Sequence, residues 1–65
     1  MAQSLYRPLT ERLRSARCEF RRQAAGSHEI WYSPITMKHF SIPANISSPR
    51  LANEILKQAG LPKAY

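Results

Sequence analysis

One histidine and two arginines are the residues of this sequence whose types and spacing could do chemistry. His28 follows Gly26 and Ser27 at a point where a loop enters an expected strand, so a ligand could reach its side chain from outside. Arg21 and Arg22 lie on the preceding segment, and they come close to His28 if the two segments form a hairpin. An imidazole with an unperturbed pKa of about 6.5 can take or give a proton at neutral pH. The three side chains together suit acid–base chemistry on a phosphate group.

RNA is the phosphate compound that this chemistry fits, because its 2′-hydroxyl is a built-in nucleophile. A histidine set among guanidinium groups that hold the backbone could act as general acid or base in metal-free cleavage. His28 could instead form an ordinary hydrogen bond in its loop or bind phosphate without taking part in catalysis. For a lone histidine, the residues alone favour such a non-catalytic role. Both roles stay open at this point.

Other kinds of chemistry lack the residues that they need. The sequence has no Asp, one cysteine, Cys18, and two histidines, His28 and His39, which fall on different expected strands. A zinc site needs three or four ligands, and a phosphate-binding glycine loop needs more than the 2 glycines present. We therefore expect no metal and no small-molecule cofactor. Cys18 is expected to pack in the interior, and His39 to face solvent.

The chain has 65 residues and a mass of 7.5 kDa, which leaves room for one small domain over residues 1–65. Its longest apolar runs are two or three residues, far below the roughly 20 that span a bilayer. Residues 1–6 lack the basic-then-apolar pattern of a secretory signal, and a single cysteine cannot form an internal disulfide. These features predict a small soluble protein of the cytoplasm with no membrane partner.

The charge of the chain is strongly positive. Lys and Arg total 10 against 4 Asp and Glu, which gives a net charge of +6 and a pI of about 10.3. Six arginines fall in the first 22 residues, and the planar guanidinium fork suits phosphate. A polyanionic partner is indicated, either nucleic acid or an acidic protein, with nucleic acid favoured. The alternative is a solvated basic surface that only keeps the domain soluble.

Two helices frame the sequence. A helix from Ser4 to Arg17, with Ser4 as its N-cap, is predicted by apolar residues at helical spacing: Leu5, Leu9, Leu13 and Ala16. A second helix is predicted from Pro49 to Ala59. Ser48 is a suitable N-cap, Pro49 fits the first helical position, and Gly60 fits a C-cap.

Three strands are predicted between the helices, at 19–23, 28–33 and 38–43. This order predicts an α+β fold of two layers, in which both helices cover one face of a three-stranded antiparallel sheet and leave the other face open. If Ile30 and Tyr32 face the helices, His28 is nominally inward and Trp31 lies on the uncovered face, where it could stack on a base. In the alternative, Trp31 belongs to the core.

Four stretches of the sequence together carry a resemblance to a known protein family. They are Phe20-Arg21-Arg22-Gln23, Gly26-Ser27-His28-Glu29-Ile30-Trp31-Tyr32, Ile42-Pro43 and Ile55-Leu56-Lys57-Gln58-Ala59-Gly60-Leu61. With the helix-strand-strand-strand-helix order, they resemble the HicA family of small toxins from type II toxin–antitoxin pairs. The resemblance runs from about Leu5 to Tyr65. One departure is the short connection after Pro43, where many members carry a histidine and this chain has Ala44, Asn45 and Ile46.

The resemblance implies a ribosome-independent and metal-independent endoribonuclease, an mRNA interferase, with a fold like that of double-stranded-RNA-binding domains. It implies that His28 is the catalytic histidine, that mRNA is the substrate, and that a HicB-type antitoxin protein binds and blocks the toxin. On this basis Arg21, Arg22, Ser27 and Lys38 are the candidate RNA-binding residues. The alternatives are a non-catalytic RNA-binding module or decayed toxin that retains only antitoxin or RNA binding, and a protein-interaction domain with an acidic partner.

Overall fold

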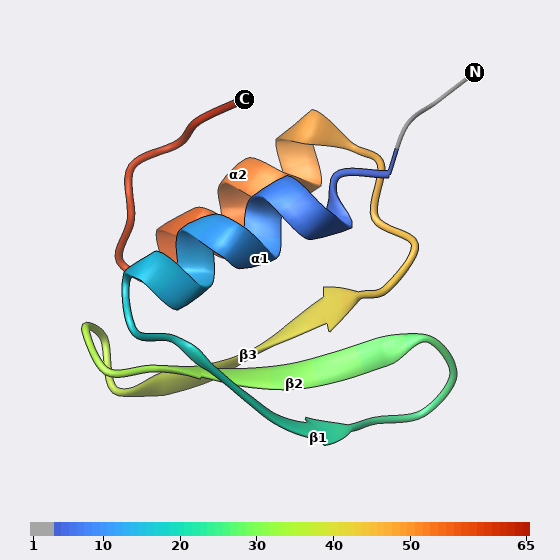
Figure 1. Ribbon diagram of the computed structural model, residues 1–65, viewed down its shortest axis with the longest axis horizontal. Coiled ribbons are helices and arrows are strands. Elements are labelled where there is room, and N and C mark those ends of the chain that lie inside the picture. The colour runs from blue at the N-terminus through green and yellow to red at the C-terminus, as the bar shows by residue number, and fades with distance from the viewer. Residues whose placement is uncertain (1–3) are drawn as a thin grey trace.

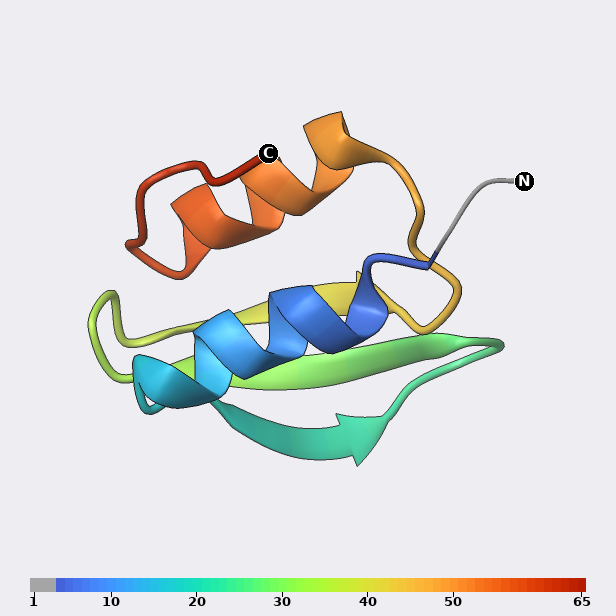
Figure 2. The same ribbon diagram turned by 45° about the horizontal axis from the view of Figure 1, so that its top comes forward.

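The computed structural model describes residues 4–65 (Figure 1). Its elements follow in the order α1, β1, β2, β3 and α2, with the bounds Tyr6–Ser15, Glu19–Gln23, His28–Ser33, Lys38–Pro43 and Pro49–Gln58. The three strands form one antiparallel sheet in the order β1-β2-β3. Figures 1 and 2 show both helices on the same face of this sheet. The predicted α+β fold and the predicted bounds of all three strands are confirmed.

Helix α1 begins at Tyr6, later than the predicted start at Ser4. The cap position is taken by Leu5, and the Ser4 hydroxyl, one residue earlier, accepts a hydrogen bond from the Tyr6 N–H at 3.2 Å. The Leu5 N–H donates to the Ile46 carbonyl at 2.8 Å, so the chain leading into α1 is held against the loop that precedes α2. The prediction of Ser4 as the N-cap is therefore wrong by one position.

Helix α1 also ends earlier than predicted, at Ser15 instead of Arg17. Arg17 has a φ of +68°, in the left-handed region, and the Cys18 N–H donates back to the Leu13 carbonyl at 2.9 Å. This arrangement closes a helix C-terminus with a left-handed residue, a position that glycine usually fills. The spacing of the apolar residues predicted a longer helix because it carries no information about this turn. The usual signal for such a turn is a glycine, and this position is an arginine.

Helix α2 begins as predicted. The Ser48 hydroxyl accepts from the Leu51 N–H at 3.2 Å, and Pro49 is the first helical residue, where no N–H is needed. The helix ends at Gln58, one residue before the predicted end, and Gly60 follows the cap with a φ of +85°. Among the described residues, neither helix has the length and apolar content to cross a membrane.

Trp31 lies at the centre of the core and is fully buried. The Phe20 ring packs against its indole in an edge-to-face arrangement, with ring centroids 6.2 Å apart and an angle of 86° between the ring planes, and the Arg14 guanidinium lies 5.4 Å from the indole centroid. Trp31 therefore belongs to the core, and the alternative that placed it on the uncovered face and His28 inward is wrong. The predicted burial of Cys18 is confirmed. The other buried apolar residues are Leu9, Leu13, Phe40, Ile42, Ile46, Ala52, Ile55, Leu56 and Ala59.

The turn between β2 and β3 is tied to the C-terminus of α2. The fully buried Ser33 hydroxyl donates to the Ala59 carbonyl at 2.7 Å and accepts from the Ile35 N–H at 3.2 Å. The Thr36 hydroxyl donates to the Gln58 carbonyl at 3.0 Å. These bonds satisfy carbonyls that a helix end leaves without partners, and they hold the far end of the sheet in place.

Gly60 is the tightest point of this junction, and substituting it with alanine should destabilise the fold. A Cβ on Gly60 would lie 2.7 Å from the Ile35 Cγ2, and its φ of +85° disfavours any L-residue. We expect Gly60→Ala to lower the free energy of unfolding by about 2–4 kcal/mol, from the left-handed strain plus the clash. Gly26→Ala is the matched control, because Gly26 also has positive φ but has nothing within 4 Å of its Cβ position. It should lose only about 1–2 kcal/mol. Equal losses in urea unfolding would contradict this account.

Candidate active site on the open sheet face

The open face is the side of the sheet away from the helices, and the burial of Trp31 decides which side chains lie on it. Side chains alternate along a strand, so Ile30 and Tyr32, which flank Trp31 on β2, point away from the helices. Directly opposed residues share a face, which adds Ser41, opposite Ile30, and His39, opposite Tyr32. The open face comprises Glu19, Arg21, Arg22, His28, Ile30, Tyr32, His39, Ser41 and Pro43. The exposure of His39 confirms its predicted orientation.

A β-bulge in β1 brings both predicted arginines to the open face. The pairing with β2 shifts by one residue between Phe20 and Arg22, so that Arg22 lies opposite Ile30. In a regular strand Arg21 and Arg22 would point to opposite faces, but the extra residue of a bulge removes this alternation locally. The Arg21 guanidinium lies 4.9 Å from the centroid of the Tyr32 ring, which places it on the open face as well. The bulge therefore concentrates two cations on one side of a five-residue strand.

His28 is the first residue of β2, and its side chain is exposed. Its Nδ1 lies 3.2 Å from the Ser41 Oγ on β3. The Gln23 Nε2 and the Ala24 N–H both donate to the His28 carbonyl, at 3.0 Å and 2.8 Å. The backbone of His28 is thus held from β1 and its ring from β3, and Nε2 is the ring nitrogen that can meet a ligand.

Arg22 and Ser27 are the predicted site residues nearest to His28. Arg22 is the diagonal neighbour of His28 across the β1–β2 pair, a separation of about 7–8 Å between backbone positions. Ser27 is exposed in the turn before His28, and its carbonyl accepts from the Ala44 N–H at 2.7 Å. Gly26, with a φ of +65°, has open space on its Cβ side. The turn is therefore fixed to the end of β3 and still accessible to a ligand.

Lys38 lies at the other end of the sheet. It begins β3 opposite Ser33, whereas His28 lies opposite Pro43 at the end of β3. At about 3.3 Å per residue, the five-residue separation along β3 corresponds to about 16 Å. The structure therefore brings Arg22 and Ser27 toward His28, whereas Arg21, whose guanidinium lies against the Tyr32 ring, and Lys38 lie farther along the sheet. Lys38 instead lines a depression of about 420 Å³ together with Thr36, His39, Glu54, Lys57 and Gln58.

Two features of the open face were not predicted. One is Ser41, the hydrogen-bond partner of His28. The other is the pair of rings formed by Tyr32 and His39, whose centroids lie 4.9 Å apart at an angle of 57°. The signal that could have found both is the size of Trp31, because placing the largest apolar side chain in the core puts His28, Ser41 and Tyr32 on one face.

The arginines of the first 22 residues are divided between two sides of the molecule. Arg21 and Arg22 belong to the open face. On the helical side, Arg14 lies over the indole, and the Arg12 guanidinium lies 5.9 Å from the centroid of the Tyr65 ring. The charge cluster seen in the sequence is therefore not one continuous patch. Of the six arginines in the first 22 residues, two lie on the open face.

Behind the open face, Glu29 connects β2 to α1. Its Oε1 accepts hydrogen bonds from the Tyr6 Oη at 2.7 Å and from the Trp31 Nε1 at 3.0 Å. Burial raises the pKa of the Tyr6 phenol above 10.0, and the hydrogen bond and negative charge of Glu29 raise it further, against a smaller lowering by Arg14. Glu29 follows His28 in the chain, so this contact fixes the strand from which His28 projects.

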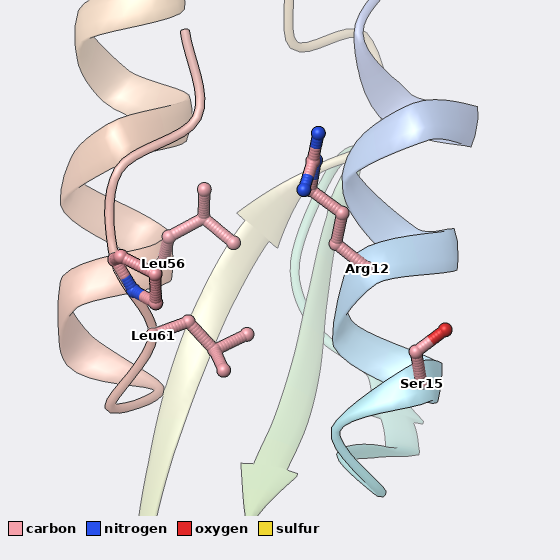
Figure 3. Close-up of a pocket in the computed structure, with 5 residues that line it drawn as sticks. Arg12, Ser15, Leu56 and Leu61 are labelled. Atoms are coloured by element: carbon pink, nitrogen blue, oxygen red, sulfur yellow. The ribbon is translucent and has the colours of Figure 1, made fainter.

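A further pocket is lined by none of the predicted site residues. This pocket has a volume of about 230 Å³ and is lined by Arg12, Ser15, Leu56, Leu61 and Pro62. It lies between α1 and α2 (Figure 3). Burial raises the pKa of the Cys18 thiol, opposed by a hydrogen bond with Ser33, so Cys18 is held as a neutral packing residue. Within residues 4–65, no three His, Cys, Asp or Glu side chains gather as metal ligands would.

Comparison with protein families finds a match over most of the chain. Residues 6–61, from the start of α1 to the residue after Gly60, match the model of a family described as "HicA toxin of bacterial toxin-antitoxin". The matched segment contains all five elements and every residue of the open face. No curated protein and no solved structure matches the chain. The family match confirms the resemblance found in the sequence.

The contact behind His28 predicts the effect of removing the Tyr6 hydroxyl. Tyr6→Phe deletes a hydrogen bond to a carboxylate, and we expect it to lower the free energy of unfolding by about 1–2 kcal/mol near neutral pH. Because the folded-state pKa of Tyr6 is raised, the stability linked to its proton is present below about pH 10 and is lost as the pH rises through the folded-state value. The difference between wild type and Tyr6→Phe should therefore shrink above about pH 10.

Tyr65→Phe is the control for this measurement, because Tyr65 is exposed and its ring contact with Arg12 does not need the hydroxyl. It should change the stability by less than about 0.5 kcal/mol. Urea unfolding of the three proteins at both pH values checks the prediction. A loss for Tyr6→Phe no larger than that for Tyr65→Phe would show that the Glu29 contact does not support β2.

Proposed function

Since this chain belongs to the HicA toxin family of bacterial toxin–antitoxin systems, we propose that it cleaves mRNA as a ribosome-independent endoribonuclease. The family is known for ribonuclease activity in general. In this proposal His28 is the general acid or base, no metal takes part, and a HicB-type antitoxin blocks the toxin. The observation that carries the proposal is an exposed histidine on a rigid strand, with one ring nitrogen engaged by Ser41 and two arginines on the same face.

The geometry around His28 supports proton transfer at Nε2. When the neutral ring donates its Nδ1–H to the Ser41 hydroxyl, Nε2 carries the lone pair and can accept the proton of an attacking hydroxyl. When the ring is protonated, Nε2–H can donate to the oxygen of the departing nucleotide. In either form the hydrogen bond with Ser41 reduces rotation of the ring, so that Nε2 stays directed outward. Ser41 is in this sense a positioning residue.

The arginines supply charge where the reaction develops it. A phosphate that passes through a five-coordinate state gains negative charge on its free oxygens, and guanidinium groups held nearby stabilise that charge. Arg22 is the diagonal neighbour of His28, and Arg21 lies farther along the same strand pair. In the proposal Arg22 contacts the phosphate at His28 and Arg21 a more distant one. Ser27 offers its hydroxyl from the turn beside His28, and Lys38 contacts RNA only at the other end of the sheet.

The proposed partner of the toxin is an antitoxin of HicB type. Family membership indicates a toxin–antitoxin partnership in general terms. The net charge of +6 favours an acidic protein as the partner, and the exposed arginines of the open face offer it a basic surface. An antitoxin that covers this face would exclude RNA from His28, which is the simplest form that neutralisation could take.

A second function, RNA binding without cleavage, is favoured by one observation. The side-chain partner of His28 is a serine hydroxyl, which does not titrate near neutral pH and cannot act as the second acid or base. A binding module would grip RNA through the arginines and lose affinity linearly in log salt, with no strand breaks. Incubation of purified protein with RNA in the presence of a chelator separates the two functions, because only the enzyme produces fragments.

Replacing His28 tests the proposed catalysis. His28→Ala should reduce RNA cleavage by at least about 100-fold, the usual contribution of a general acid or base. The fold should persist because the side chain is exposed. Induced expression in a bacterial host, with RNA integrity followed over time, should show growth arrest and mRNA loss only without this substitution. Lys63→Ala, in the exposed C-terminal segment, is the control and should remain toxic. Full toxicity of His28→Ala would refute the catalytic role.

Replacing Arg22 tests the proposed contact with phosphate. In a His28→Ala background, which prevents cleavage, Arg22→Ala should weaken RNA binding and make the slope of log affinity against log salt shallower by about 0.7, the value of one phosphate contact on a single strand. Arg7→Ala removes an exposed arginine of α1 and should leave the slope unchanged. The same slope for both variants would mean that Arg22 binds no phosphate.

A further inference from the structure

Three side chains form a row across the open face at the end opposite His28. The Arg21 guanidinium of β1 lies 4.9 Å from the centroid of the Tyr32 ring on β2. The Tyr32 ring lies 4.9 Å from the ring of His39 on β3, centroid to centroid. The Glu19 carboxylate pairs with Arg21 at 3.4 Å and holds the guanidinium in place. We call these three residues, Arg21, Tyr32 and His39, the stacking row.

The stacking row has an exposed end that can accept another flat group. Tyr32, in the middle, is half-buried, whereas His39 is exposed, so one side of its imidazole faces Tyr32 and the rest is accessible. Tyr32 supports the ring from behind and limits its rotation. Aromatic rings on a sheet surface are the platforms on which proteins stack unpaired nucleic-acid bases, because every base has a π face.

The surroundings of His39 are suited to the backbone that carries such a base. The depression beside it is lined by two cations, Lys38 and Lys57, and one anion, Glu54. On the open face itself, Arg21 and Arg22 outnumber the single carboxylate of Glu19. This excess of positive charge favours a polyanion as the ligand over a protein surface that combines acidic and apolar residues. It also disfavours a second copy of this basic chain.

The position of the row relative to His28 defines a path for an RNA strand. His28 and Tyr32 lie on the same strand, four residues apart, which corresponds to about 13 Å. The half-buried Ile30 and the exposed Arg22 lie between them on the same face. At about 3.4 Å per nucleotide of a stacked strand, this distance corresponds to about four nucleotides.

We propose that the stacking row binds one unpaired RNA base on the exposed face of His39, a fixed number of nucleotides from the phosphate at His28. The ligand is therefore single-stranded RNA, because the bases of a duplex are paired and stacked on each other. This inference rests on the proposed function in that it assumes an RNA substrate, but it concerns binding and needs no cleavage. It also gives Lys38, which lies far from His28, a role in the depression beside His39, where it would contact the backbone of the bound strand.

The test measures RNA affinity in a His28→Ala background by fluorescence anisotropy with a labelled, unstructured oligoribonucleotide. His39→Thr removes the ring at an exposed strand position, and binding should weaken by about tenfold, the typical effect of losing one stacked base. His39→Phe keeps a ring but no ionisable group, and it should bind within about twofold of the parent. A loss below about fivefold for His39→Thr overturns the proposal. An equal loss for both variants also overturns it, because the contact would then depend on the imidazole nitrogens and not on stacking.

A scan of abasic nucleotides through the same RNA locates the stacked base. One abasic position should weaken binding to the parent protein and leave binding to His39→Thr unchanged, as expected when both changes remove the same contact. Binding of the duplex form as tight as that of the single strand would overturn the proposal. The proposal would also be overturned if the free protein sedimented as a dimer and His39→Thr sedimented as a monomer. A second copy of the chain would then cover the stacking row. Failure of the proposed function appears elsewhere, as absence of cleavage by the protein that retains His28.

Discussion

The burial of Trp31 is the interaction on which the rest of the structure depends. A tryptophan side chain removes roughly 150–250 Å² from water, which is worth about 4–6 kcal/mol at about 25 cal/mol per Å². A small domain has only about 5–15 kcal/mol of stability in total, so turning this side chain outward would cost a large share of it, and the fold strongly favours the register that buries Trp31. Its indole N–H also has a partner inside, the Glu29 carboxylate. Because side chains alternate between the two faces along a strand, His28 and Tyr32 then lie on the open face.

Because Trp31 points toward the helices, other residues on the same side of β2 can hold the sheet against the helices. Glu29 and Ser33 share the inner side of β2 with Trp31, and they lie at its two ends. Glu29 reaches Tyr6 at the start of α1, and Ser33 reaches the Ala59 carbonyl at the end of α2. The strand that carries the candidate active site is thus fixed at both ends through its inner face. A rigid strand with a supported inner side can hold an exposed histidine in one orientation, which a mobile loop does not.

Much of this arrangement could be predicted from the sequence, and the parts that could not have physical reasons. The bounds of β2 and β3, correctly predicted, already imply the register that pairs Tyr32 with His39, because a hairpin of given ends has one alignment. The face of β2 could not be predicted from periodicity, since the run from Ile30 to Tyr32 is apolar at every position. The bulge at Arg21 leaves no mark in the sequence either, and without it Arg22 would point toward the helices. The left-handed Arg17 likewise occupies a position where glycine would have been the signal.

The size of the chain explains why the candidate site lies on a flat face. A domain of this length buries only about 60% of the surface of its unfolded chain, so its interior is filled by the contacts that keep it folded. A site that enclosed a small substrate would have to remove core residues that such a domain needs. A polymer does not have to be enclosed, because its binding energy is spread over several nucleotides, and RNA brings its own nucleophile to the reaction. In the proposed ribonuclease reaction, the protein has to supply one oriented proton-transfer group and a few fixed cations. The face opposite Trp31 presents both, with His28 held by Ser41 and two arginines aligned by a bulge.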